Sequence, residues 1–204
     1  MLFLDEAPEF AGGCLDALRQ PLESGEVVLA RSGGTVRYPA RFTLVLAANP
    51  CPCGTADADC VCTPHVRRRY GNKLSGPLLD RVDLVVGLAK PTRAELLAER
   101  AFIEPSAAVA ARVAGARDLA RQVFAGRPWA LPSGIPGSEL RRDFAPVAGA
   151  TAVLEPELRR GRLSARGLDR TLRVAWTLAF CAGRSRPHTA DVHTALGLRL
   201  GAAA

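Results

Sequence analysis

Although 48% of the 204 residues are hydrophobic, glycine, proline and arginine interrupt every apolar run well before the roughly 18 residues that a membrane span requires. Asp5, Glu6 and Glu9 stand where a signal peptide would have its basic region and apolar core. We therefore expect a cytoplasmic protein with no transmembrane helix, of one domain or two small ones.

Charge is spread unevenly along the chain, whose formal net charge is +7. Residues 1–111 carry 12 basic and 13 acidic side chains, whereas residues 112–204 carry 15 arginines against 7 acids. The second region is therefore a candidate surface for a polyanion. The alternative is a solvated basic face, because arginine outnumbers lysine 25 to 2 in the whole sequence, as a GC-rich coding sequence would give.

The first half of the chain predicts a mixture of strands and helices. The expected elements are a buried strand at 1–5, a helix at 15–22, a hairpin with strands at 27–30 and 35–38, and further strands at 42–48 and 82–88. A region rich in cysteine, proline and arginine at 50–70 is expected to be an insertion.

The second half predicts helices alone, joined by a connector rich in proline and glycine at 126–137. The expected helices lie at 93–102, 107–124, 138–144, 146–160, 164–182 and 189–200, with Ser164 and Thr189 as N-caps. We expect two domains, at 1–91 and 92–204.

The opening strand runs directly into Asp5 and Glu6. Such a strand suits nucleotide hydrolysis, because the first carboxylate can hold Mg²⁺ through water and the second can orient and deprotonate the attacking water. In isolation, the same residues would also fit a strand that ends in a surface acidic pair. A phosphate-binding loop, G-x-x-x-x-G-K-[ST], should precede such a strand. Because the only lysines are Lys73 and Lys90, we expect that loop upstream of Met1 and expect these residues to be inactive alone.

Two further polar residues lie next to expected strands. Asn49 follows an apolar run and could donate to a γ-phosphate or hold the attacking water, although Asn-Pro is also a common turn opener. Arg81 precedes the third expected strand, where an arginine finger of a ring ATPase would reach the neighbouring subunit's γ-phosphate. The alternative is an ion pair of Arg81 with Asp80 or Asp83.

Arg166 lies in the first turn of an expected helix, just after Ser164. The helix dipole disfavours a cation there, so such an arginine is often paired with an anion, for example a bound phosphate. A solvated basic face that continues through Arg170 and Arg173 is the alternative.

Four cysteines lie within twelve residues: Cys51, Cys53, Cys60 and Cys62. Their thiolates could close a tetrahedral zinc site and fix the insertion, with His65 as a substitute ligand. The alternative is a reduced, exposed loop with labile thiols. Cys14 and Cys181 lie among apolar residues, so we expect both to be buried.

A dense basic tip follows the cysteines, at Arg67–Arg69, Tyr70 and Lys73. It could grip phosphates and stack Tyr70 on a base, or hold acids of an adjoining subunit. The expected hairpin, with Arg31 and Arg37, is a second candidate for contact with DNA.

Five segments, taken in order, resemble the magnesium-chelatase-like AAA+ ATPases of the ComM/YifB type, and the match spans nearly the whole chain. The segments are Leu2–Phe10, Leu15–Gly25, Tyr38–Phe42, Ala48–Pro50 and Leu74–Asp83. The resemblance implies an α/β fold: a partial AAA+ P-loop NTPase core, with a parallel sheet and a β-hairpin insert, followed by an all-helical lid bundle.

The resemblance also implies the chemistry. By it, Asp5 and Glu6 correspond to the Walker B acids, Asn49 to sensor 1, Arg81 to the arginine finger and Arg166 to the sensor 2 arginine of the lid. It implies ATP and Mg²⁺ as cofactors, and a phosphate loop and a protease-like domain before Met1.

The same resemblance implies a homo-oligomeric ring, a hexamer, that acts on single-stranded or branched double-stranded DNA. The implied role is branch migration and recombination during natural transformation. Two rival functions stay open: a non-catalytic DNA-binding module stabilised by zinc, and an ATPase subunit of a metal chelatase.

Overall fold

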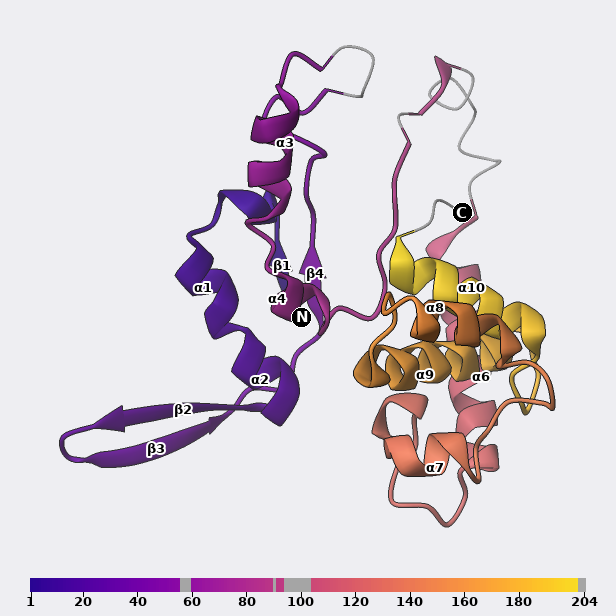
Figure 1. Cartoon of the computed structure of the whole chain (residues 1–204). Helices are drawn as coiled ribbons and strands as arrows, with labels where there is room; N and C mark the ends of the chain where they lie inside the picture. Colours follow the sequence, from indigo (N-terminus) through magenta and orange to yellow (C-terminus); the bar gives the residue numbers. More distant parts are fainter. Residues whose placement is uncertain (56–59, 90, 94–103, 202–204) are drawn as a thin grey trace. The chain divides into compact units, whose positions relative to one another are not determined.

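The computed structural model describes residues 1–55, 60–89, 91–93 and 104–201. The chain forms two compact units, residues 1–82 and residues 83–204, called unit 1 and unit 2 from here on. Figure 1 shows strands and helices in unit 1 and, over the described residues, helices alone in unit 2. This confirms the expected mixed α/β fold with a helical second part.

Unit 1 is built on a small parallel sheet. Strand β1 (Leu2–Leu4) pairs with strand β4 (Leu44–Leu46). Two backbone hydrogen bonds extend this pairing, from the amide of Ala47 to Leu4 (2.9 Å) and from the amide of Ala7 to Ala47 (2.8 Å). Because the strands are parallel, their carboxyl ends lie at the same edge of the sheet.

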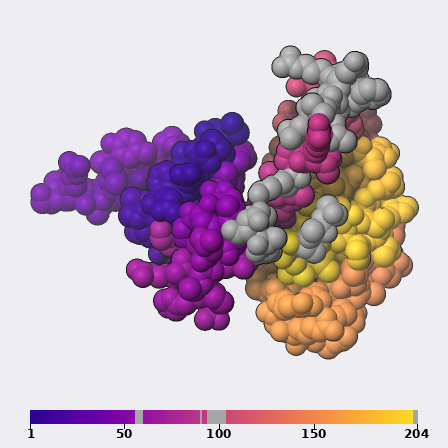
Figure 2. Space-filling model, turned by 90° about the horizontal axis from the view of Figure 1, so that it is seen from above, coloured from indigo at the N-terminus to yellow at the C-terminus, as the bar shows by residue number. Residues whose placement is uncertain are grey.

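After a short 3-10 helix, the connection between these strands contains α1 (Gly12–Ala17), α2 (Arg19–Ser24), β2 (Glu26–Arg31) and β3 (Gly34–Pro39). Helix α2 ends at Gly25, whose φ of 71° is left-handed and favours glycine. Strands β2 and β3 form the expected antiparallel hairpin, with a two-residue turn between Arg31 and Gly34. In Figures 1 and 2 this hairpin stands out from the rest of unit 1.

Three short helices complete unit 1: η1 (Ala7–Glu9), α3 (Pro64–Gly71) and α4 (Gly76–Leu79). The hydroxyls of Thr63 and Ser75 cap α3 and α4, each accepting a hydrogen bond of 3.4 Å from a backbone amide of the first turn. Proline in the first turn of each helix fits, because an amide there has no partner within the helix.

The strand expected at 82–88 does not form among the described residues. Residues 83–89 run without helix or strand, and the amide of Val85 donates to the carbonyl of Leu198 (2.6 Å). Leu84, Val86 and Leu88 are between 48% and 91% exposed. The apolar pattern fits a strand, but a strand also needs a partner edge, and here the backbone bonds to the end of a helix instead.

The described part of unit 2 contains helices α6 (Ser106–Val123), η4 (Pro132–Gly134), α7 (Gly137–Arg141), η5 (Ala152–Leu154), α8 (Glu155–Arg159), α9 (Ala165–Cys181) and α10 (Thr189–Leu200). The helix expected at 93–102 lies almost wholly outside the described residues. The prediction of a helix at 146–160 is wrong for its first half. Gly149 has a φ of 80°, a left-handed conformation that does not occur inside a right-handed α-helix.

An aromatic cluster forms the centre of unit 2. Phe124, Phe144, Trp176 and Phe180 have neighbouring ring centroids 5.3 to 6.0 Å apart. The indole nitrogen of Trp176 donates to the carbonyl of Phe144 (2.9 Å). The apolar face of α9 packs on this cluster, so unit 2 has a continuous hydrophobic core.

Two of the six cysteines are placed differently from the expectation. Cys14 and Cys181 are exposed, so the expectation that both fill a core is wrong. Their neighbours in sequence, Leu15 and Phe180, are buried in the same helix turns.

Candidate functional site

The carboxyl edge of the β1–β4 sheet brings together three of the predicted site residues. Asp5 and Glu6 directly follow β1, and Asn49 lies three residues after the end of β4. All three side chains are exposed. Two carboxylates and one amide therefore follow the carboxyl ends of the two strands, at the same edge of the sheet.

The backbone at Glu6 is unusual. Glu6 has φ 49° and ψ 42°, the left-handed conformation, and is the one non-glycine residue with positive φ among those the structure describes. Its amide donates to Oδ1 of Asp5 (3.0 Å). A left-handed conformation costs an ordinary residue about 1 kcal/mol or more. Such strain on an exposed glutamate is a reason to look for function there.

Asn49 lies against the cysteine-rich segment. Its side-chain nitrogen is 3.8 Å from the position that a Cβ on Gly54 would take. Gly54 has φ of 69°, and its amide donates to the carbonyl of Cys51 (3.1 Å). The tight turn at 51–54 thus folds back onto Asn49.

Arg81 is held within unit 1. Its side chain is 12% exposed and forms an ion pair with Glu23 at the end of α2. It also donates to the carbonyl of Pro77 (2.8 Å). An arginine finger would have to leave this pair to reach another subunit. No local sequence pattern indicates Glu23 as the partner of Arg81.

Arg166 belongs to unit 2. It is the second residue of α9 and is exposed. The hydroxyl of Ser164 accepts from the amide of Gly167 (3.0 Å), which confirms the predicted N-cap. Of the two arginines that continue this run, Arg170 pairs with Asp83 and Arg173 donates to the carbonyl of Ile135 (2.8 Å). Both therefore have structural roles.

The four predicted metal ligands come together in one cluster: Cys51, Cys53, Cys60 and Cys62, whose sulfurs all lie within 4.8 Å of one another. Cys51 is 1% exposed and the other three are half-buried. Hydrogen bonds from Thr55 and then from Cys51 lower the pKa of Cys53 to about 5. His65 is not part of this cluster.

Tyr70 connects the cysteine-rich insertion to the acidic strand end. Tyr70 is 5% exposed, and burial, followed by the charges of Glu9 and Glu6, raises its pKa above the ordinary value. The ammonium of Lys73 lies 3.4 Å from a carboxylate oxygen of Glu9 and 5.6 Å from the centre of the Tyr70 ring. The expectation that Tyr70 stacks on a base is wrong, because the ring belongs to the core of unit 1.

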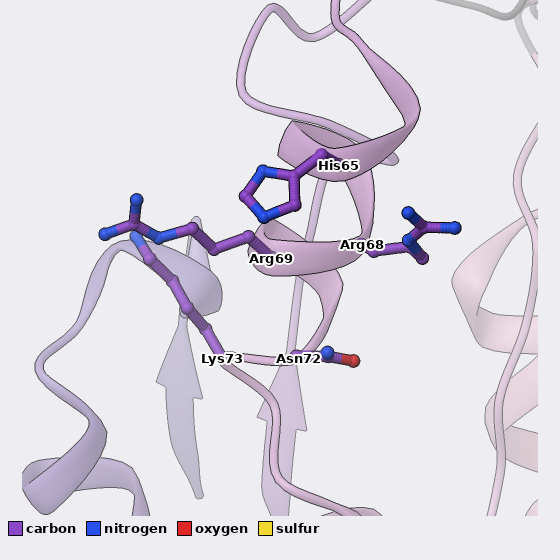
Figure 3. Close-up of a pocket in the computed structure, with 5 residues that line it drawn as sticks. All are labelled: His65, Arg68, Arg69, Asn72 and Lys73. Carbon is purple, nitrogen blue, oxygen red and sulfur yellow. The ribbon is translucent and has the colours of Figure 1, made fainter.

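The exposed face of α3 forms a basic hollow of about 420 Å³. Its lining residues are His65, Arg68, Arg69, Asn72 and Lys73. In Figure 3 the side chains of Arg69 and Lys73 extend to one side of the helix and those of Arg68 and Asn72 to the other. Arg68 and Arg69 form no ion pair with any residue that the structure describes. The hollow therefore presents cationic groups to solvent.

Most arginines of unit 2, in contrast to Arg68 and Arg69, are paired with acidic residues. At least ten of the fifteen arginines in residues 112–204 form ion pairs with acids of the same unit. All seven acids of that region take part. Much of the basic composition therefore serves contacts within the unit, whereas Arg68 and Arg69 of α3 form no ion pair among the described residues.

Two family models match the chain. The model for magnesium chelatase, subunit ChlI, matches residues 1–96, and the model for its C-terminal part matches residues 103–199. Together they cover both units. The chain belongs to the magnesium chelatase ChlI family. Its expected resemblance to the ComM/YifB type is confirmed by the curated relatives.

An uncharacterized protein of Mycobacterium tuberculosis is 50% identical over 200 residues, which cover 98% of this chain and 39% of the relative. The competence protein ComM of Haemophilus influenzae is 37% identical over 203 residues, which cover 98% of this chain and 38% of the relative. The uncharacterized protein YifB of Escherichia coli is 42% identical over 181 residues, which cover 88% of this chain and 35% of the relative.

The chain thus spans less than two fifths of the length of these relatives. Among the described helices, none combines the length and the apolar character that crossing a membrane requires.

Proposed function

We propose that this chain is part of a ring-forming AAA+ ATPase that acts on DNA. In this proposal, the carboxyl edge of the β1–β4 sheet supplies residues for ATP hydrolysis, and unit 2 is the lid. The observation that supports the proposal is the parallel pairing of β1 and β4, because Asp5, Glu6 and Asn49 all follow the carboxyl ends of these strands. Membership of the family supports ATP and Mg²⁺ as its cofactors.

The donor set at this edge fits Mg²⁺. Magnesium prefers oxygen ligands and often keeps waters between itself and a carboxylate, and Asp5 offers an exposed carboxylate beside the strand end. Bound Mg²⁺ would neutralise charge that develops on the phosphates. Glu6 accepts a proton from the attacking water, and Asn49 orients that water or donates to the γ-phosphate.

The arginines complete the proposed site from other elements. Arg81 contacts the γ-phosphate bound by a neighbouring subunit after it leaves Glu23, and Arg166 contacts phosphate from the lid. Both guanidiniums would stabilise charge in the transition state. A site shared in this way requires a ring, and a hexamer is the form we propose.

DNA is the proposed substrate because the basic hollow on α3 suits a phosphate backbone. The hairpin β2–β3, with Arg31 and Arg37, gives a second exposed element for contact with the strand. The relative from Haemophilus influenzae is named a competence protein, which supports a role in branch migration and recombination during natural transformation.

The test places this chain in the position of the matching 200 residues of the mycobacterial relative and measures ATP hydrolysis with and without branched DNA. We expect hydrolysis that DNA stimulates. Replacing both Arg68 and Arg69 by alanine should weaken DNA binding by about tenfold at moderate salt. The matched control replaces Arg121 and Arg159, which are exposed but paired with acids of unit 2.

The name of the matched family favours a second candidate, an ATPase subunit of a metal chelatase. Hydrolysis that DNA leaves unchanged, and that a porphyrin and its partner subunits raise, would support that candidate. Salt-sensitive DNA binding by the 204 residues, with no nucleotide binding in the chimera, would instead support the non-catalytic DNA-binding module.

A further inference from the structure

We propose that Cys51, Cys53, Cys60 and Cys62 bind one structural zinc ion, and that this ion fixes the segment between the end of β4 and the start of α3. The inference goes beyond the proposed ATPase activity, because it concerns a second metal site that needs no nucleotide. Its support is the geometry of the four sulfurs and their place in the chain.

The distances between the sulfurs suit one shared metal ion. Cys51 lies 3.1 Å from Cys53 and 3.4 Å from Cys60, and Cys53 lies 3.7 Å from Cys60. A tetrahedron with zinc–sulfur bonds of about 2.3 Å has sulfur–sulfur edges of about 3.8 Å. A disulfide would bring two sulfurs to about 2.05 Å. The cluster is therefore too open for disulfides and close to the size of a tetrahedral site.

The identity and number of the ligands favour zinc in a structural role. Four thiolates with no position left for water are typical of structural zinc sites, whereas catalytic sites keep one open position. Soft sulfur donors also exclude Mg²⁺ as the occupant. Cys51 is almost fully buried, so the site is partly closed to solvent.

The position of the ligands explains what the ion would stabilise. Cys51 lies two residues after Asn49, and Cys62 directly precedes Thr63, the N-cap of α3. One ion bound by all four cysteines would tie the carboxyl edge of the sheet to the helix that carries the basic hollow. We call this link the clamp: zinc bound by the four cysteines would hold the carboxyl edge of the sheet, with its proposed hydrolytic residues, to helix α3, with its proposed DNA-binding residues.

The first test measures metal content and thiol reactivity of the 204-residue chain purified under reducing conditions. We expect about one zinc ion per chain. Cys53→Ser and Cys60→Ser should each reduce zinc content at least about tenfold. The matched control is the double variant Cys14→Ser and Cys181→Ser, which removes the two exposed cysteines outside the cluster and should keep full zinc content.

Thiol reactivity of the unmodified chain keeps the test independent of variants that fail to fold. With zinc bound, the two cysteines outside the cluster should react quickly with a thiol reagent, and the four ligands should react only after a chelator is added. A chain without zinc whose six thiols all react at once would overturn the proposal, and so would a disulfide between any two of the four cysteines.

The second test measures amide hydrogen exchange with and without the chelator. Removing zinc should speed exchange in α3 (Pro64–Gly71) by about tenfold or more, because the clamp at its N-cap is lost. Exchange in α9 of unit 2 should not change and serves as the internal control. Unchanged exchange in α3 would overturn the clamp, whatever the zinc content.

Discussion

The two units obtain their stability in different ways. Unit 2 buries four of the five buried aromatic side chains among the described residues, and they pack on each other in one core. The fifth buried aromatic side chain, that of Tyr70, lies in unit 1. The two-stranded sheet of unit 1 exposes Phe3 (54%) and Val45 (39%). Polar contacts add to this small core, as in the pairs Lys73–Glu9 and Arg81–Glu23. The unit with the candidate site is thus the one with the smaller core.

Removing the central aromatic of unit 2 should have the largest effect on stability. Trp176→Ala deletes a ring that is 3% exposed and touches three other aromatic rings. We expect the free energy of unfolding of unit 2 to fall by about 3–5 kcal/mol, measured by urea denaturation followed through Trp129 fluorescence. Leu131→Ala is the control, since Leu131 is 46% exposed; an equal loss there would contradict a localised core.

Breaking the ion pair between Arg81 and Glu23 in unit 1 should have the second-largest effect on stability. Glu23→Gln leaves the guanidinium of Arg81, which is only 12% exposed, without its carboxylate. We expect a loss of about 1–2 kcal/mol in unit 1, measured by hydrogen exchange of the β1 and β4 amides. The double variant Glu23→Gln and Arg81→Met should recover most of that loss, because it removes the buried charge as well. A double variant as unstable as the single one would show that the pair is not the cause.

Tyr70 should make unit 1 sensitive to alkaline pH. Its pKa is raised in the folded chain, so its stabilising effect is complete below the unfolded pKa of about 10 and is lost as pH rises through the folded value. Tyr70→Phe should remove part of the loss of stability between about pH 9 and pH 11. Tyr38→Phe, in the exposed hairpin, should not change it. Equal behaviour of the two variants would contradict a buried Tyr70.

The smallest effect is expected at the base of the hairpin. Glu26 and Arg37 form an exposed ion pair at 3.1 Å, and exposed pairs of this kind contribute little. Glu26→Gln should leave both the melting temperature and the hydrogen exchange of unit 1 unchanged. A clear loss of stability would show that the hairpin packs on something other than solvent.

The sequence predicted those features that depend on local patterns. The strand that precedes Asp5 and Glu6, the Ser164 cap and the hairpin follow from apolar runs, capping residues and turn glycines. The cysteine spacing also predicted the cluster. The motif at 63–64, a threonine followed by proline, indicates the start of α3 inside the insertion expected at 50–70.

The features that the sequence did not predict depend on partners distant in the chain. The pairing of Arg81 with Glu23 joins residues 58 apart, and the burial of Tyr70 depends on how α3 packs in unit 1. Residues 82–88 have a strand pattern but no partner edge among the described residues. Pattern alone indicates what a segment prefers, whereas pairing and burial depend on the rest of the fold.

The central claim is that Glu6 activates water at the edge shared with Asp5 and Asn49. The most direct measurement compares ATP hydrolysis and ATP affinity of Glu6→Gln and of Glu26→Gln, both in the chimera with the mycobacterial relative. We expect Glu6→Gln to lower the turnover rate by about 100-fold or more, as loss of a general base does, with ATP affinity little changed and Glu26→Gln fully active. A turnover rate in Glu6→Gln equal to that of the control would contradict the account.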